Sequence, residues 1–308
     1  MRNSGTAVEV HDLSRAFGSF VAVDKISLRV AKGEIFGFLG PNGAGKSTTI
    51  RMLCGLLMPT GGGGTVGGHD IGAEPEAVKR IIGYMSQKFS LYDDLTVEEN
   101  IDFFGGVYRV PKEKKGERKA WVLTMAGIED KRRVLTGTLA TGFKQRLALG
   151  CAVLHEPPVL FLDEPTSGVD PMSRRRFWDL IREMADSGAA IFVTTHYMQE
   201  ADYCDRLALI YRGRIVAEGA PMRLRQDYMK REILEIETER TVEALEILLN
   251  NGIESAIFGS AIHATVEDAA LSSQRIGQIM ESEGIAVERI ERIMPSLEDV
   301  FVSLIEES

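Results

Sequence analysis

A run of glycines that ends in a lysine and a hydroxyl residue is the first feature of this sequence that could do chemistry. The run satisfies G-x-x-x-x-G-K-[ST] and consists of Gly40, Pro41, Asn42, Gly43, Ala44, Gly45, Lys46, Ser47 and Thr48. Glycines here let successive backbone N–H groups face a phosphate, while Lys46 reaches the outer phosphates of a nucleotide and the Ser47 hydroxyl binds Mg²⁺. The alternative is a structural glycine turn, but an apolar run before the motif and a helix-compatible stretch after it favour a phosphate loop.

Two adjacent carboxylates follow a second apolar run. The run Val159-Leu160-Phe161-Leu162 leads directly into Asp163 and Glu164. A buried parallel strand there would place Asp163 at its carboxyl end beside Ser47, where the carboxylate could hold Mg²⁺. Glu164 would then be placed to polarise an attacking water as a general base. Paired carboxylates at a strand end can also form a helix cap or a solvated turn, but the phosphate loop upstream favours the chemical interpretation.

The elements that must position these groups form an α/β pattern. Short apolar runs at 34–39, 159–162 and 189–195 are typical of buried strands, and a helix is predicted at 173–185 between the last two. This alternation predicts a parallel sheet with right-handed crossovers. The first domain, predicted over 1–226, is completed by an antiparallel β start over 8–30, an all-helical insertion over about 89–156 and a terminal hairpin over 207–219.

Two further segments have an unusual composition. Thr60 to Gly68 holds six glycines, which predicts a locally mobile turn between a helix and a strand. The triplet Arg174-Arg175-Arg176 predicts the exposed start of a helix rather than a phosphate clamp.

The composition changes after about Gln226 to acidic, alternating strands and short helices. We predict a separate small α+β domain over 227–308, and its β-α-β-α-β-α order indicates a ferredoxin-like sandwich. The six predicted elements are 232–237, 241–250, 255–267, 271–283, 286–294 and 297–306.

Composition and charge exclude several classes of protein. The 308 residues include 36 Lys and Arg against 45 Asp and Glu, and the net charge of −9 disfavours general binding to nucleic acid or anionic lipid. Three separated cysteines indicate neither a disulfide framework nor a zinc site. No apolar run approaches the length of a membrane span, and the N-terminus lacks the pattern of a signal peptide. We therefore expect a folded cytosolic protein that is not itself a channel or a carrier.

At this point the sequence resembles the ATP-binding subunit of ABC transporters, over residues 7 to about 225. The resemblance assigns Phe17 to stacking on adenine and Gln87 to joining Mg²⁺ and water to the helical insertion. It also identifies Ser167-Gly168-Val169-Asp170 as the D-loop and His196 as the switch histidine that contacts the γ-phosphate. Taken singly, Phe17 is more typical of a core residue and His196 of an ordinary strand end. Their joint order favours the family assignment.

The family resemblance implies a head-to-tail pair of subunits, in which the signature segment of one subunit completes the ATP site of the other. The family's signature is Leu-Ser-Gly-Gly-Gln, and the matching positions here are Leu139-Ala140-Thr141-Gly142-Phe143. Ala140 lacks a hydroxyl for the γ-phosphate, and a hydrogen bond to a charged group is worth about 1.5–3 kcal/mol. Thr141 has a Cβ where the family's glycine would permit a close approach of the backbone. Gly142 and the start of the following helix still offer backbone N–H groups to a phosphate. Two hypotheses stay open here: the change has little effect, or it belongs to a weakly hydrolytic site.

Within the family, the sequence is most similar to ATPase subunits of ABC-2 type exporters, the YbhF-like multidrug efflux group. The segments that carry this likeness are Tyr84 to Tyr92, Gly142 to Leu149, His155 to Pro157 and Pro295 to Phe301. The resemblance implies a P-loop NTPase core with an antiparallel β subdomain and a helical insertion. It further implies ATP and Mg²⁺ as cofactors, a second ABC ATPase subunit in a homo- or heterodimer, and an ABC-2 type integral membrane permease.

The resemblance therefore predicts an ATP-hydrolysing subunit, held on the inner face of the cell membrane by permease subunits, that powers export of drugs or other small hydrophobic compounds. One alternative is a weakly hydrolytic regulatory subunit of a heterodimeric exporter. The altered signature residues Ala140 and Thr141 favour this alternative. Another is a soluble ABC ATPase that acts on DNA or ribosomes. The negative charge, the single phosphate loop and the lack of a long coiled coil argue against the latter.

Overall fold

The computed structural model describes residues 5–87, 90–228 and 231–306, which fold as two compact units, Met1–Pro221 and Met222–Ser308. The division falls five residues before the 226/227 boundary expected from composition, at the start of α7 (Pro221–Tyr228). Within the described residues, no helix combines the length and the apolar character that crossing a bilayer requires.

The first unit is built around a six-stranded sheet in the order β10-β9-β3-β8-β7-β6. All neighbours are parallel except β10 and β9, which form the expected terminal hairpin. The strands are β3 (Ile35–Leu39), β6 (Ile82–Met85), β7 (Val159–Asp163), β8 (Ala190–Thr195), β9 (Arg206–Tyr211) and β10 (Arg214–Gly219). Every residue of β3, β7 and β8 is buried, which explains why the sequence shows continuous apolar runs there.

Aromatic packing holds the centre of this sheet together. The ring of Phe192 lies 5.6 Å from that of Phe36, 5.3 Å from that of Phe38 and 5.7 Å from that of Phe161. All four side chains are fully buried, and they come from the three central strands β3, β7 and β8. This cluster fixes the lateral order of the strands whose carboxyl ends carry the phosphate loop and the two carboxylates.

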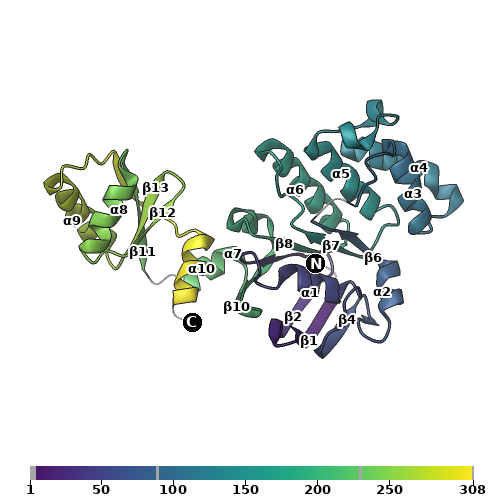
Figure 1. Ribbon diagram of the computed structural model, residues 1–308, viewed down its shortest axis with the longest axis horizontal. Coiled ribbons are helices and arrows are strands. Elements are labelled where there is room, and N and C mark those ends of the chain that lie inside the picture. The colour runs from purple at the N-terminus through teal and green to yellow at the C-terminus, as the bar shows by residue number, and fades with distance from the viewer. Residues whose placement is uncertain (1–4, 88–89, 229–230, 307–308) are drawn as a thin grey trace. The chain divides into compact units, whose positions relative to one another are not determined.

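Helices cover this sheet, and a second, antiparallel sheet lies beside it (Figure 1). The helices are α1 (Lys46–Leu53), α2 (Pro75–Ile81), α3 (Val97–Val107), α4 (Lys112–Ala126), α5 (Thr141–Ala152) and α6 (Pro171–Asp186). Short 3₁₀ turns occur at Glu129–Lys131, Thr136–Thr138 and Met198–Tyr203, the last of which we call η3. Helices α3, α4 and α5 pack on one another around their own apolar core and form the predicted helical insertion.

The second sheet has the order β2-β1-β4-β5 and contains a glycine-rich segment whose structure differs from the sequence prediction. Its strands are β1 (Thr6–Phe17), β2 (Phe20–Ala31), β4 (Gly61–Val66) and β5 (His69–Asp70). The glycine-rich segment expected to be a mobile turn forms β4, which pairs with β1. A Cβ on Gly64 would lie 2.2 Å from the carbonyl oxygen of Glu9, so glycine is required by the close approach of two strands.

The second unit has the predicted ferredoxin-like topology, with one correction. The segment predicted as a single strand over 255–267 is a hairpin of two strands, because Gly259 turns the chain at φ 60°. The sheet order β12-β13-β11-β14 is covered on one face by α8 and α9 (Figure 1). The elements are β11 (Glu232–Glu237), α8 (Thr241–Asn250), β12 (Ser255–Phe258), β13 (Ala261–Val266), α9 (Ala269–Ser282), β14 (Arg289–Ile293) and α10 (Leu297–Glu306).

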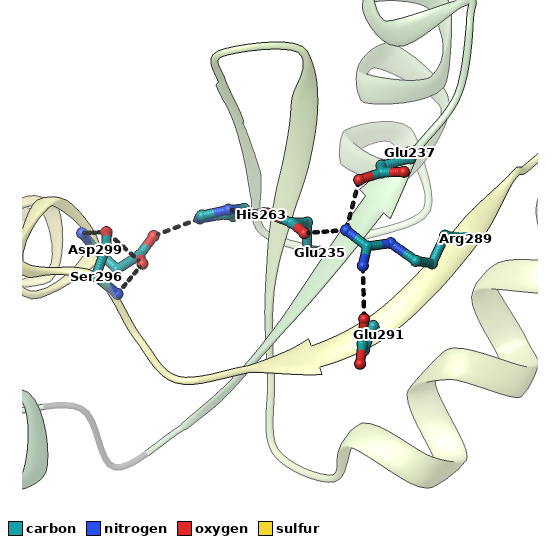
Figure 2. A network of polar contacts seen from close by, with 7 residues as sticks. All are labelled: Glu235, Glu237, His263, Arg289, Glu291, Ser296 and Asp299. Carbon is teal, nitrogen blue, oxygen red and sulfur yellow. Dashed lines mark hydrogen bonds and ion pairs between the residues drawn. The ribbon is translucent and has the colours of Figure 1, made fainter. Parts of the chain in front are cut away.

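A polar network lies on the other face of this small sheet (Figure 2). Ile262 and Ala264 of β13 pack in the core of the unit, so His263 between them points to the opposite face. Its Nδ1 lies 3.1 Å from a carboxylate oxygen of Asp299 in α10, and its Nε2 lies 3.3 Å from one of Glu235 in β11. The ring of Phe258 stacks on the imidazole at 4.3 Å.

The network continues on both sides of His263. Arg289 forms ion pairs with the carboxylates of Glu235, Glu237 and Glu291, while Asp299 accepts hydrogen bonds from the backbone N–H and hydroxyl of Ser296 (Figure 2). Burial lowers the pKa of His263, but the hydrogen bonds and charges of Asp299 and Glu235 outweigh it, and the pKa is raised. Burial likewise raises the pKa of Asp299, yet the hydrogen bonds from His263 and Ser296 prevail and lower it.

We expect these shifts to make the stability of the second unit depend on pH. The raised pKa of His263 stabilises the fold below about pH 6.5, and this stabilisation is lost as pH rises through the folded-state value. The lowered pKa of Asp299 contributes above about pH 4 and is lost at lower pH. Hydrogen-exchange protection of the β13 amides in the full chain, corrected for intrinsic exchange, should fall as the pH rises from 6 to 8.5. The variant His263→Gln should show no such fall, and an equal pH dependence in this variant would contradict the assignment.

Candidate nucleotide-binding site

The phosphate loop lies at the carboxyl edge of the parallel sheet, between β3 and α1. Helix α1 begins at Lys46, and its N-cap Gly45 has φ 110°. A Cβ on Gly45 would lie 2.6 Å from the carbonyl oxygen of Ala22, so both the backbone angle and the available space require glycine. The cap residue brings no side-chain hydrogen bond, which leaves the first N–H groups of α1 and its dipole for an anion.

Lys46 is a buried cation whose ammonium group has three partners. Its side chain is 4% exposed, and Nζ donates to the carbonyl oxygens of Gly40 at 2.7 Å and Pro41 at 3.1 Å. Nζ also lies 3.2 Å from Oε1 of Glu164. These contacts account for all three N–H donors of the ammonium and hold its positive charge under the loop.

Glu164 is the residue at which the separate motifs meet. Its side chain is 6% exposed, and Oε2 accepts a hydrogen bond from Nε2 of Gln87 at 3.0 Å and lies 3.1 Å from Nδ1 of His196. Its backbone N–H donates to Thr194, and its φ of 48° lies in the left-handed region that non-glycine residues rarely occupy. Lys46, Gln87 and His196, which are distant in sequence, thus converge on one carboxylate. The family resemblance assigns Gln87 to Mg²⁺ and water and His196 to the γ-phosphate, and these roles stay predictions.

A set of oxygen donors lies beside this carboxylate. The hydroxyl of Ser47 donates to Oδ1 of Asp163 at 3.0 Å, and the hydroxyl of Thr194 donates to the same atom at 2.7 Å. A hydroxyl and a carboxylate at the edge of a phosphate loop fit Mg²⁺, which keeps several waters and shares phosphate oxygens. In the described ranges no group of three or more His, Cys, Asp and Glu side chains gathers as a metal site, in keeping with such a sparse donor set. Gln87, the third expected ligand, uses its amide N–H on Glu164, and its contact with a metal stays a prediction.

The remaining predicted residues lie apart from this centre. Phe17, at the end of β1, is 47% exposed and has the guanidinium of Arg15 at 4.6 Å from its ring, so it is a surface aromatic and not a core residue. Asp170 caps α6 by accepting the N–H of Ser173 at 2.9 Å, and this hydrogen bond lowers the pKa of its carboxyl. The roles of Phe17 in stacking on adenine and of Asp170 at a subunit contact stay predictions.

The signature segment also lies apart from the phosphate loop. Ala140 is the N-cap of α5 and makes no side-chain cap hydrogen bond, while Thr141 and Gly142 form the first turn of that helix. Among the described residues, no hydrogen bond or ion pair joins Ala140, Thr141 or Gly142 to the phosphate loop of the same chain. That the signature segment completes the ATP site of another subunit stays a prediction.

Sequence analysis missed Thr194, whose hydroxyl holds Asp163 and whose backbone and hydroxyl oxygens hold the N–H of Glu164. The available signal was a hydroxyl residue at the carboxyl end of an apolar strand, two positions before His196. It also missed Gln145 of α5, which is fully buried and donates from its side-chain amide to the carbonyl of Pro165, next to Glu164.

Comparison with known proteins places this geometry in a family. The sequence profile described as "ABC transporter" matches residues 23–167. The daunorubicin/doxorubicin resistance ATP-binding protein DrrA of Streptomyces peucetius is 38% identical over 272 residues, which cover 87% of this chain and 80% of that protein. The chain belongs to the ABC transporter ATP-binding proteins.

Two further members of this family differ in how much of their length the chain covers. The Nod factor export ATP-binding protein I of Rhizobium sp. (strain N33) is 35% identical over 302 residues, covering 98% of the chain and 97% of that protein. The probable multidrug ABC transporter ATP-binding protein YbhF of Escherichia coli (strain K12) is 50% identical over 216 residues. This match covers 70% of the chain but 37% of YbhF, so the chain spans well under half of that relative.

Solved ABC ATP-binding cassettes confirm the fold of the first unit. One, described as the ATP-binding subunit of an ABC transporter, superposes with a TM-score of 0.66 at 30% identity, covering 72% of this chain and 93% of the other. Another, a dimeric cassette in a post-hydrolysis state bound to ADP and Pi, has a TM-score of 0.63 at 25% identity, covering 69% of this chain and 98% of its own. The predicted α/β P-loop class is therefore correct.

We expect Lys46→Met to weaken binding of Mg-ATP by about 10- to 100-fold, because a charge-assisted contact worth roughly 1.5–3 kcal/mol is lost while the apolar stem is kept. Isothermal titration of the purified chain measures this change. Lys79→Met, which removes an exposed lysine paired with Glu76 in α2, is the matched control and should bind as the wild type does. Equal affinities of the two variants would contradict the placement of Lys46 at the phosphates.

Proposed function

We propose that this chain binds ATP with Mg²⁺ and hydrolyses it between two ATPase subunits, and that the cycle powers an ABC-2 type permease that exports drugs or other small hydrophobic compounds. The observation that carries the proposal is the convergence of Lys46, Gln87 and His196 on the buried carboxylate of Glu164, at 3.0–3.2 Å. In this proposal the permease holds the protein at the inner face of the cell membrane.

The contacts of Lys46 support a change in the hydrogen bonding of Glu164, the proposed general base, when a phosphate binds. The ammonium group uses one of its three donors on Oε1 of Glu164. A bound phosphate competes for that donor, because a phosphate carries more negative charge than a single carboxylate. Oε1 then becomes available to accept a proton from the attacking water, while Gln87 and His196 keep Oε2 in place. Mg²⁺ held by Ser47 and Asp163 would supply charge neutralisation at the phosphates.

The position of the signature segment supports the proposal of a second ATPase subunit. Gly142 and the start of α5 carry backbone N–H donors, and in the described part of the chain no hydrogen bond or ion pair joins them to the phosphate loop. A cassette with the same fold has been solved as a dimer with ADP and Pi. A head-to-tail pair would place one such helix start on each nucleotide.

The helical insertion offers a surface for the permease. Tyr92, Phe103 and Val107 are 45%, 42% and 56% exposed, and the first two rings meet edge to face at 4.7 Å. Exposed aromatic and aliphatic side chains in one region are typical of an interface for a partner protein. The surface follows Gln87 closely in sequence, and Gln87 contacts Glu164, so a permease bound there would be connected with the catalytic carboxylate.

A second candidate is a weakly hydrolytic regulatory subunit of a heterodimer. The missing side-chain cap at Ala140 is the observation in its favour. The intact contacts of Glu164 argue against it. Relatives named for drug resistance and for Nod factor export also favour the energising role.

We expect Glu164→Gln to abolish ATP hydrolysis while Mg-ATP still binds, because the amide cannot accept the proton of the attacking water. Light scattering during size-exclusion chromatography should then show this variant as a dimer with Mg-ATP and as a monomer without it. Glu183→Gln, an exposed glutamate of α6, is the matched control. A Glu164→Gln chain that binds Mg-ATP and stays monomeric would exclude a self-sufficient homodimer.

We expect Ala140→Ser to raise kcat by about 3- to 30-fold, because a serine at this N-cap can donate to a phosphate and also cap α5. Steady-state ATPase assays of the purified chain measure the change. Thr138→Ser, which keeps a hydroxyl two positions earlier, serves as the control. An unchanged kcat in Ala140→Ser would show that the backbone donors of the signature segment suffice.

A further inference from the structure

An ion pair outside the phosphate site joins the first turns of helix α6, which follows the loop Ser167–Asp170, to η3, which follows His196. Nε of Arg174 in α6 lies 3.5 Å from Oε1 of Glu200 in η3, and the Thr166 hydroxyl donates to the same oxygen at 2.5 Å. The Glu200 side chain is 1% exposed and that of Arg174 is 23% exposed. The sequence prediction of an exposed arginine triplet is therefore wrong for Arg174, although Arg175 and Arg176 are exposed.

The guanidinium of Arg174 makes two more contacts, one with each loop. Nη2 donates to the carbonyl oxygen of Val169, inside the segment Ser167–Asp170, at 3.4 Å. The face of the guanidinium covers the ring of Tyr197, with Cζ 4.6 Å from the ring centroid. The Tyr197 ring in turn lies 4.0 Å from the imidazole of His196, which contacts Glu164. One side chain thus connects the loop after Glu164 with the histidine that holds Glu164.

Only arginine can make these three contacts together. The guanidinium donates from Nη2 to Val169 and holds Nε at ion-pair distance from Glu200 while its planar face stacks on an aromatic ring, whereas a lysine ammonium has no planar face to stack. A buried carboxylate such as Glu200 also requires a cation nearby, because an unpaired buried charge is strongly destabilising. The pair therefore constrains both loops at once.

We propose that Arg174 and Glu200 are positioning residues that fix the loop Ser167–Asp170 and the switch histidine His196 in one arrangement around Glu164. The inference rests on the proposed function and adds the route by which the two loops act together. A displacement of Ser167–Asp170 moves Val169, and the guanidinium passes this movement through Tyr197 to His196. Neither residue contacts the phosphate loop within the described part of the chain, so they act on the chemical step and not on ATP affinity.

Steady-state kinetics of Arg174→Lys, Arg174→Ala and Glu200→Gln test the proposal, with Arg175→Ala as the matched control on the same turn of α6. We expect kcat to fall about 10- to 100-fold in the three variants, because a catalytic group is misplaced, while KM for ATP stays within about twofold. Arg174→Lys keeps the positive charge but loses the planar guanidinium. A fall in its kcat with an unchanged midpoint of thermal unfolding would therefore show a positioning role and not a loss of stability. Kinetics of Arg174→Lys equal to those of Arg175→Ala, or losses that only follow the thermal midpoint, would overturn the proposal.

Hydrogen exchange provides a readout that does not depend on hydrolysis. In Arg174→Lys we expect amide exchange to rise about tenfold both in 167–170 and in 196–200, and to stay unchanged in the phosphate loop 40–47. Wild-type chain without ATPase activity would count against the proposed function alone, and the exchange measurement would still decide the positioning role. A rise in only one of the two loops, or in neither, would show that the arginine does not connect them.

Discussion

The structure of the candidate site depends on the requirement that a buried carboxylate be paired. Glu164 is almost inaccessible to water, and removing a charge from water is costly unless opposite charge and hydrogen-bond donors replace the solvent. Lys46, Gln87 and His196 meet this requirement from three different segments. The phosphate loop, the end of β6 and the end of β8 are therefore held at one place by a single side chain.

The parallel sheet makes this convergence possible. The strands β3, β7 and β8 run in the same direction, so the loops that follow them all emerge at the same edge. The aromatic cluster around Phe192 keeps these strands in order. Thr194 of β8 accepts a hydrogen bond from the backbone N–H of Glu164 and donates one to the side chain of Asp163 in the neighbouring strand β7. These two hydrogen bonds fix the two adjacent carboxylates in different directions. Asp163 faces the hydroxyl of Ser47, and Glu164 faces Lys46.

The two units differ in how polar groups are used. In the first unit, buried charge is gathered at one edge of a sheet, where Lys46 pairs with the carboxylate of Glu164. In the second unit, His263 lies between Asp299 and Glu235 and fastens α10 to the face of the sheet opposite α8 and α9. The first arrangement joins segments around a phosphate loop, whereas the second joins a helix to a sheet.

The sequence by itself determined the family and the presence of a phosphate loop and two adjacent carboxylates, because these depend on residue types at fixed short spacing, and it predicted their chemistry. It also determined the parallel strands, since burial on both faces demands continuous apolar runs. Only the tertiary structure decided that the glycines at 61–64 form a strand, that residues 255–267 form a hairpin and that Arg174 is partly buried. The first and last of these features arise from close approaches between residues far apart in the chain, Gly64 to Glu9 and Arg174 to Glu200, and local composition carries no record of such distances. The hairpin instead depends on a local turn at Gly259, whose positive φ the alternating pattern does not reveal.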